Sequence, residues 1–203
     1  MEQVDKNDYN QEPISWQQYL DEIGPLFRFC TNATVLEIGP YYGHHTKLIE
    51  TFGPEAITLV ENNADAVNVL RQRFEHEIIH ADINDFLKVN RHFDVVVCCG
   101  VLYHLHSPVH LLELIVNMST PKIVILESVN VSTIEMTVEP DNNPGMRYID
   151  ESWKSAKCNM VLPFNTIISI MKTLGYKLAD HHMQGYPNII SKQNVQSAVF
   201  IQQ

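Results

Sequence analysis

Short apolar runs alternate with amphipathic segments from residue 34 onward. Runs of four to eight residues rich in Val and Ile are typical of buried strands, whereas apolar residues spaced three or four apart predict helices. The predicted strands are 34–38, 56–61, 77–80, 93–98, 121–127, 176–183 and 195–202, and the predicted helices are 43–52, 63–74, 83–88, 108–118 and 165–174. This alternation indicates βαβ units and a parallel sheet, hence an α/β fold.

Two segments depart from this rhythm. Residues 1–30 form a polar tail followed by a helix that starts at Ser15 and extends to Phe27, which we expect to pack on the domain or cover the pocket. Residues 129–163 show no clear periodicity, and a loop of that length in a compact domain is usually a lid or a substrate-binding segment. We therefore predict a single domain over residues 1–203 that contains both segments.

The first predicted strand ends in Glu37 and runs into a turn between Gly39 and Gly43. Open parallel sheets bind their ligands at the carboxyl ends of the strands. A dinucleotide fingerprint, G-x-G-x-x-G, needs its second glycine where the backbone approaches the pyrophosphate, and this chain has Tyr41 there. The turn therefore disfavours a pyrophosphate and favours a nucleoside ligand without phosphates. The alternative is a plain helix start with Glu37 as a capping carboxylate.

The pattern E-x-G-P-x-x-G resembles the first motif of class I S-adenosylmethionine (SAM) methyltransferases. The resemblance implies a Rossmann-like, doubly wound, mainly parallel seven-stranded sheet with helices on both faces and an antiparallel last strand. It also implies that Gly39, Pro40, Tyr41 and Gly43 form the turn beneath the amino-acid tail of SAM, and that Glu37 engages the ammonium group of that tail.

Acidic residues also follow the second and third predicted strands. Glu61 lies twenty-two positions after Gly39, close to the offset at which a Rossmann acid meets the ribose hydroxyls. By resemblance, Asp82 accepts from the adenine amine while Ile83 packs on the ring. Asn62 is grouped with these cofactor residues, although Asn62 and Asn63 also suit the N-cap of the next helix. Glu61 could instead be a solvated strand-end acid, and Asp82 a helix cap.

The fourth predicted strand leads into Cys99, Gly100, Tyr103 and His104. A fourth strand beside the first ends at the topological switch point, so the residues just beyond it line the crevice. Cys99 and Gly100 are therefore expected beside the cofactor. Tyr103 and His104 are the catalytic candidates, because histidine can act as a general base near neutral pH. Alternatively, His104 hydrogen-bonds locally and Tyr103 is part of the wall.

Residues 100–108 are similar to the segment that follows the fourth strand in the tRNA wobble-uridine (carboxy)methyltransferase family. Later stretches of that family are similar to residues 125–128, 144–148 and 163–176. The similarity suggests that Glu127 and Arg147 face the acceptor. The family has a basic residue before its final strand that holds the carboxylate of carboxy-SAM, and this chain has Ser197 there. We therefore expect ordinary SAM.

The formal net charge of −10 repels polyanions, which argues against RNA or DNA as the acceptor. The N-terminus lacks the pattern of a signal peptide, and no apolar run is long enough for a membrane span, so we expect a cytoplasmic protein without a membrane partner. The cysteines show no C-x-x-C spacing and the histidines no H-E-x-x-H motif, so we expect buried thiols and no metal.

These observations predict a SAM-dependent methyltransferase that acts on an oxygen or nitrogen of a small-molecule acceptor. The alternatives are an RNA-modifying methyltransferase of the wobble-uridine type, a non-catalytic SAM-binding module and a nicotinamide oxidoreductase on a similar sheet. The oligomeric state and the acceptor itself are not encoded in any motif of the chain.

Overall fold

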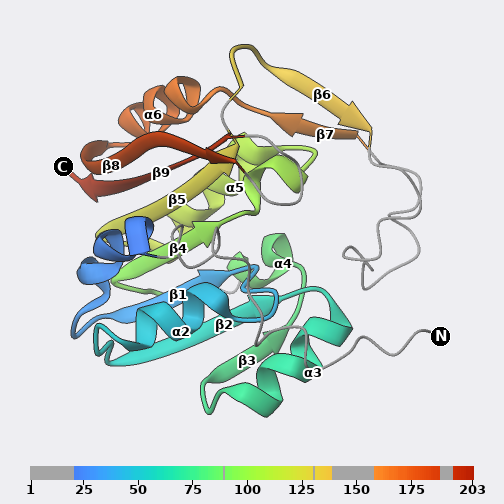
Figure 1. The fold of residues 1–203 in the computed structure, drawn as a ribbon, viewed down its shortest axis with the longest axis vertical. Helices are drawn as coiled ribbons and strands as arrows, with labels where there is room; N and C mark the ends of the chain where they lie inside the picture. Colours follow the sequence, from blue (N-terminus) through green and yellow to red (C-terminus); the bar gives the residue numbers. More distant parts are fainter. Residues whose placement is uncertain (1–20, 89, 130, 139–157, 188–193) are drawn as a thin grey trace.

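The computed structural model describes residues 21–88, 90–129, 131–138, 158–187 and 194–203. Its centre is a seven-stranded sheet with the order β3-β2-β1-β4-β5-β9-β8 (Figure 1). The strands are β1 (Thr34–Ile38), β2 (Ala56–Glu61), β3 (Glu77–His80), β4 (Val95–Cys99), β5 (Ile123–Val129), β8 (Tyr176–Pro187) and β9 (Asn194–Gln202). Strands β1 to β5 pair in parallel, and β9 runs antiparallel to both β5 and β8. The predicted fold class is confirmed.

Two apolar clusters cover the two faces of the sheet, because alternate residues of each strand point to opposite sides. One cluster joins the sheet to α4 (Ile83–Leu87), α5 (Pro108–Leu114) and α6 (Phe164–Thr173). The other joins it to η2 (Gly24–Cys30), α2 (His44–Glu50) and α3 (Ala64–Arg73). Glu37 lies two residues after Val35, and Glu61 lies two residues after Leu59, so both carboxylates are on the η2 and α2 face with the second cluster.

A two-stranded hairpin, β6 (Glu135–Val138) with β7 (Cys158–Val161), lies outside the main sheet. It stands beyond the strand ends at the top of Figure 1. The expectation of an irregular segment over 129–163 is therefore wrong for these strands, which are too short to show a period of two clearly. Arg147 and Trp153 belong to the part of 129–163 that lies outside the described residues.

Several predicted boundaries shift for local reasons. Pro121 cannot donate to a ladder, and β5 begins at Ile123 rather than at residue 121. The predicted helix from Ser15 to Phe27 is wrong at its end, because a 3-10 helix with Pro25 near its start replaces α-helix from Gly24 onward. The predicted helix 108–118 is divided into α5 and a π-helical turn, η4 (Ile115–Ser119).

Candidate functional site

The turn between β1 and α2 has a backbone that demands glycine at two positions. Gly39 and Gly43 have φ of 64° and 82°. A Cβ on Gly39 would lie 2.6 Å from Cγ2 of Val101, and a Cβ on Gly43 would lie 2.3 Å from Cε2 of Phe74. Both the dihedral angle and the space therefore exclude a side chain, which is the physical reason for the glycine spacing noted in the sequence.

Tyr41 also has a left-handed backbone, with φ of 52°, although it is not glycine. Its backbone N–H donates to Oε2 of Glu61 at 2.9 Å, and the N–H of Asn63 donates to Oε1 of the same carboxylate at 2.7 Å. Glu61 is 5% exposed, and burial raises its pKa. The end of β2 therefore holds the turn in place, and Glu61 is not the solvated strand-end acid of the alternative interpretation.

Glu37 lies at the carboxyl end of β1 and is 2% exposed. Its Oε2 accepts a hydrogen bond from Oγ1 of Thr46, in the first turn of α2, at 2.7 Å. Burial, with a smaller contribution from nearby Glu61, raises the pKa of Glu37 to about 8. An incoming cation would stabilise the ionised form of this carboxyl group. The partnership with Thr46 was not predicted, because no local pattern marks it.

Asp82 follows β3 and is the N-cap of α4. Its Oδ1 accepts from the backbone N–H of Asn84 at 2.8 Å and from Nδ2 of the same residue at 2.9 Å. Ile83, next to it, is buried in the cluster of the α4 and α5 face. Asp82 is therefore a helix cap, as the alternative interpretation predicted. Both of these hydrogen bonds are accepted by Oδ1, and Oδ2 takes part in neither.

The two asparagines after β2 have different partners. The side chain of Asn63 caps α3 by accepting from the N–H of Ala66 at 3.0 Å. The carbonyl oxygen of Asn62 lies 3.2 Å from Nε2 of His80, at the end of β3. The predicted N-cap is thus Asn63, while Asn62 links the ends of two strands at the same edge as Glu61.

The segment after β4 turns sharply at Gly100, whose φ is 76°. Cys99 before it is buried, and a Cβ on Gly100 would lie 3.5 Å from the Tyr103 hydroxyl oxygen. That hydroxyl is therefore folded back over the end of β4. Tyr103 and His104 belong to the short helix η3 (Leu102–His104), and their ring centroids are 4.3 Å apart. The two catalytic candidates, which are neighbours in sequence, thus lie just beyond the end of β4, at the switch point between β1 and β4.

Glu127 lies near the carboxyl end of β5, in register with Cys99 on β4 and with Ser197 on β9. It is 4% exposed, and Oγ of Ser197 lies 3.5 Å from its Oε2. Burial raises the pKa of Glu127 to about 8. Because strand residues in register point to the same face, Glu127 lies on the face that also carries Glu37 and Glu61.

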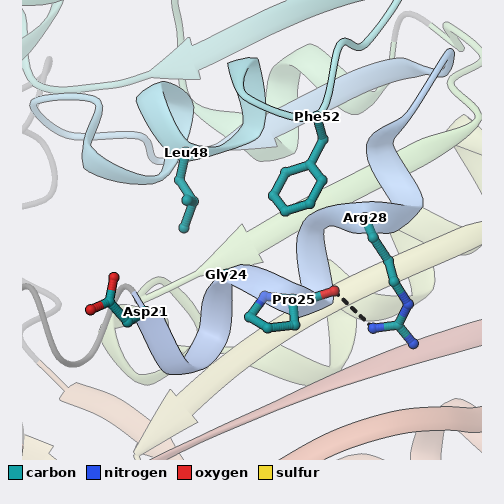
Figure 2. Close-up of a pocket in the computed structure, with 6 residues that line it drawn as sticks. All are labelled: Asp21, Gly24, Pro25, Arg28, Leu48 and Phe52. Atoms are coloured by element: carbon teal, nitrogen blue, oxygen red, sulfur yellow. Dashed lines mark hydrogen bonds between the residues drawn. The ribbon is translucent and has the colours of Figure 1, made fainter.

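A shallow groove of about 490 Å³ lies elsewhere, between η2 and α2, and Figure 2 shows its lining. Among the lining residues, the Arg28 guanidinium donates to the carbonyl of Pro25 at 2.8 Å. None of the candidate residues named above lines this groove.

Among the helices that the structure describes, none has both the length and the apolar character needed to cross a bilayer.

Comparison with known protein families identifies a family that this chain matches. A family model described as a methyltransferase domain matches residues 11–180, well over half of the chain. No curated protein sequence matches. The match is to the methyltransferase domain as a whole and does not single out the tRNA wobble-uridine branch.

Solved structures with the same fold are distant in sequence. The 1,6-didemethyltoxoflavin-N1-methyltransferase of Burkholderia thailandensis, with bound 1,6-didemethyltoxoflavin and S-adenosylhomocysteine (SAH), has a TM-score of 0.65 and 14% identity over 97% of this chain and 81% of that chain. The N-methyltransferase NodS of Bradyrhizobium japonicum WM9 has a TM-score of 0.64 and 15% identity over 94% and 98%. Magnesium protoporphyrin IX methyltransferase of Synechocystis PCC 6803, with bound SAM, has a TM-score of 0.63 and 12% identity over 92% and 80%.

The TM-scores of 0.65 and 0.64 show a shared fold despite the low identities, and the family match includes the glycine turn and the strand ends described above. The chain therefore belongs to the methyltransferase-domain family and has the class I fold of SAM-dependent methyltransferases.

Proposed function

We propose that this protein transfers the methyl group of SAM to an oxygen or nitrogen atom of a small-molecule acceptor. The observation that carries the proposal is the placement of three acidic residues, Glu37, Glu61 and Asp82, at or just beyond the carboxyl ends of β1, β2 and β3. These strands are neighbours in the order β3-β2-β1, so the three carboxylates follow one another along one edge of the sheet. The amino-acid tail, the ribose and the adenine of SAM need binding groups in this same spatial order.

Each acid has a distinct role in this proposal. Glu37 pairs with the tail ammonium, and the positive charge favours the ionised form of a carboxyl group that burial otherwise keeps protonated. Glu61 accepts from the ribose hydroxyls while it still holds the N–H of Tyr41. Asp82 accepts from the adenine amine through Oδ2, since the hydrogen bonds that cap α4 reach Oδ1.

The remaining cofactor contacts surround these acids. The turn contributes Gly39, Pro40, Tyr41 and Gly43 beneath the tail, and the strand ends contribute Asn62, Ile83, Cys99 and Gly100. The lack of room for a Cβ at Gly39 and at Gly43 supports a turn of fixed shape. A turn of fixed shape suits a ligand that is aligned by its binding site.

The reaction is attack of the acceptor oxygen or nitrogen on the methyl carbon, with the electron pair of the breaking carbon–sulfur bond returning to sulfur, which leaves SAH. The sulfonium is a good leaving group, so alignment and exclusion of water supply most of the acceleration. Tyr103 and His104, at the end of β4, position the nucleophile, and His104 takes its proton where it carries one. Glu127, near the carboxyl end of β5, contacts the acceptor, and the family resemblance suggests the same role for Arg147.

The small-molecule acceptor is supported by the toxoflavin and protoporphyrin methyltransferases among the structural relatives and by the net charge of −10. An RNA acceptor of the wobble-uridine type is the second candidate, favoured only by the sequence similarity around residues 100–108. Polyanion binding needs a basic surface, which the overall charge opposes.

Calorimetric titration with SAM, SAH and NAD tests the cofactor. We expect SAM and SAH to bind at micromolar concentration and NAD not to bind, and tight NAD binding without SAM binding would reject the proposal. Transfer of labelled methyl from SAM to parallel panels of small amines, phenols, carboxylates and tRNA then separates the two acceptor classes. A SAM-binding protein that labels neither panel would be the non-catalytic module.

His104→Ala and Tyr103→Phe test the chemistry without removing the cofactor site. We expect each variant to bind SAM with unchanged affinity and to lower kcat, by about 10²-fold for His104→Ala if it acts as a base. Unchanged turnover in His104→Ala would remove the general base and leave the rest of the proposal in place.

A further inference from the structure

Asn159 on β7 is a buried polar residue without an evident structural role. Its side chain is 4% exposed, and its Nδ2 has no hydrogen-bond partner among the residues that the structure describes. A buried amide that donates no hydrogen bond is costly to a folded protein, so such groups are few and are usually retained for a reason. A donor of this kind is available to a ligand.

The fold places Asn159 next to the catalytic candidates. The next residue, Met160, donates its backbone N–H to the carbonyl of Leu105 at 2.8 Å, which joins β7 to the residue that ends η3. The hairpin is thus attached directly to the helix that carries Tyr103 and His104.

The direction of the side chain follows from strand alternation. Val161, two residues along, belongs to the apolar cluster of the η2 and α2 face, whereas Leu162 belongs to the opposite cluster. Residues two apart on a strand share a side, so Asn159 points to the side of Val161. Tyr103 packs against that same cluster, and Glu127 lies on that same face.

We infer that Asn159 is a specificity-determining residue that donates a hydrogen bond from Nδ2 to an oxygen of the methyl acceptor. This inference depends on the proposed function. It narrows the acceptor to small molecules that carry a hydrogen-bond-accepting oxygen, such as a carbonyl oxygen, beside the nucleophilic hydroxyl or amine. We assign Asn159 to the acceptor and not to the cofactor, because β7 is hydrogen-bonded to Leu105, which directly follows the catalytic candidates Tyr103 and His104.

A second buried polar side chain, that of Ser119, provides a matched control. Oγ of Ser119 also lacks a partner among the described residues, and Ser119 is 1% exposed. Its carbonyl accepts from the N–H of Phe93, just before β4 begins, so it lies at the opposite edge of the sheet from the strand ends that form the site. Ser119 therefore shares the burial and the missing partner but not the location.

The experiment titrates the full-length, SAH-loaded protein with paired probes and follows the side-chain ¹H–¹⁵N resonances of Asn159, identified by their loss in Asn159→Asp. The pairs are salicylamide with phenol, 2-aminobenzamide with aniline, and lactamide with 2-propanol. In each pair the second compound keeps the nucleophile but has hydrogen, or methyl in 2-propanol, in place of the carboxamide. We expect the carbonyl members of at least one pair to shift the Asn159 resonances and to bind about ten-fold more tightly than their partners.

In Asn159→Asp and in Asn159→Leu we expect this ten-fold preference to disappear while the affinity for SAH stays unchanged. In the control Ser119→Ala we expect the preference and the SAH affinity of the wild type. The inference is overturned if no probe moves the Asn159 resonances, if both variants keep the preference, or if both lose SAH binding along with it. Failure of the wild-type protein to bind SAH would instead reject the proposed function, so the two failures are distinguishable.

Discussion

The carboxylate of Glu61 and the backbone N–H of Tyr41 are 2.9 Å apart, which joins the end of β2 to the turn after β1. Without this bond the left-handed conformation of Tyr41 would cost about 1–2 kcal/mol with no compensating contact at its N–H. Glu61 thus shapes the turn, in addition to its proposed contact with the ribose.

Replacing Glu61 by Ala is expected to lower SAM affinity at least ten-fold and to destabilise the protein by roughly 1–3 kcal/mol, because two backbone donors lose their acceptor. Calorimetry with SAM and urea unfolding measure the two effects. Tyr41→Phe keeps the backbone N–H and should leave the stability within about 0.5 kcal/mol of the wild type. Equal losses in both variants would contradict the role of the carboxylate.

Alanine at Gly43 is expected to cost roughly 2–4 kcal/mol, because the backbone is left-handed and the new Cβ would lie 2.3 Å from Cε2 of Phe74. Gly53 has a similar φ of 65°, but a Cβ there would have no neighbour within 4 Å. Gly53→Ala should therefore cost only about 1 kcal/mol. Urea unfolding of the two variants separates dihedral strain from steric overlap, and similar losses would show that the contact with Phe74 relaxes.

The buried carboxyl of Glu127 should make the cofactor-free protein less stable as the pH rises. Its pKa is raised to about 8, so the folded state binds its proton more tightly than the unfolded chain, whose carboxyl titrates near 4.5. The stability that this proton provides is complete below about pH 4.5 and is lost as the pH rises through about 8.

Urea unfolding at pH 5.5 and pH 8.5 measures this dependence. Glu127→Gln keeps the shape of the side chain and removes its charge, so the decline in unfolding free energy between the two values should become smaller. Glu113→Gln is a matched substitution at an exposed position on α5 and should leave the decline as it is. A decline of equal size in Glu127→Gln would mean that Glu127 is ionised throughout this range.

Asp94 should stabilise the protein in the opposite pH direction. Its carboxylate accepts from Nζ of Lys122 at 2.7 Å and from the hydroxyl and N–H of Thr34, and these bonds lower its pKa to about 2. The lowered pKa means that the stability is present above about pH 4 and is lost as the pH falls through about 2.

Asp94→Ala is therefore expected to cost about 1 kcal/mol at pH 7, a modest amount because Lys122 is largely exposed and solvent screens the pair. The difference from the wild type should vanish near pH 2, as measured by thermal unfolding at both pH values. Asp85→Ala, which breaks an exposed pair with Lys88, should have little effect at either pH.

Strand alternation and the glycine turn were readable from the chain because both depend on local physics. The apolar runs at 34–38, 56–61 and 77–80 became β1, β2 and β3 at the predicted boundaries. Gly39 and Gly43 occupy left-handed backbone positions, where residues with a Cβ are strained. Since the parallel pairing of such strands brings their carboxyl ends to one edge, the positions of Glu37 and Glu61 followed from their places in the sequence.

Only the tertiary structure decided what those residues contact. The bond from Tyr41 to Glu61 joins positions twenty residues apart, and that from Ser197 to Glu127 joins positions seventy apart, so no local pattern encodes either. The β6–β7 hairpin and the burial of Asn159 likewise depend on packing against η3, which is distant in sequence. Periodicity reports which face of an element is apolar, whereas the partner of a buried polar group is set by how the elements pack together.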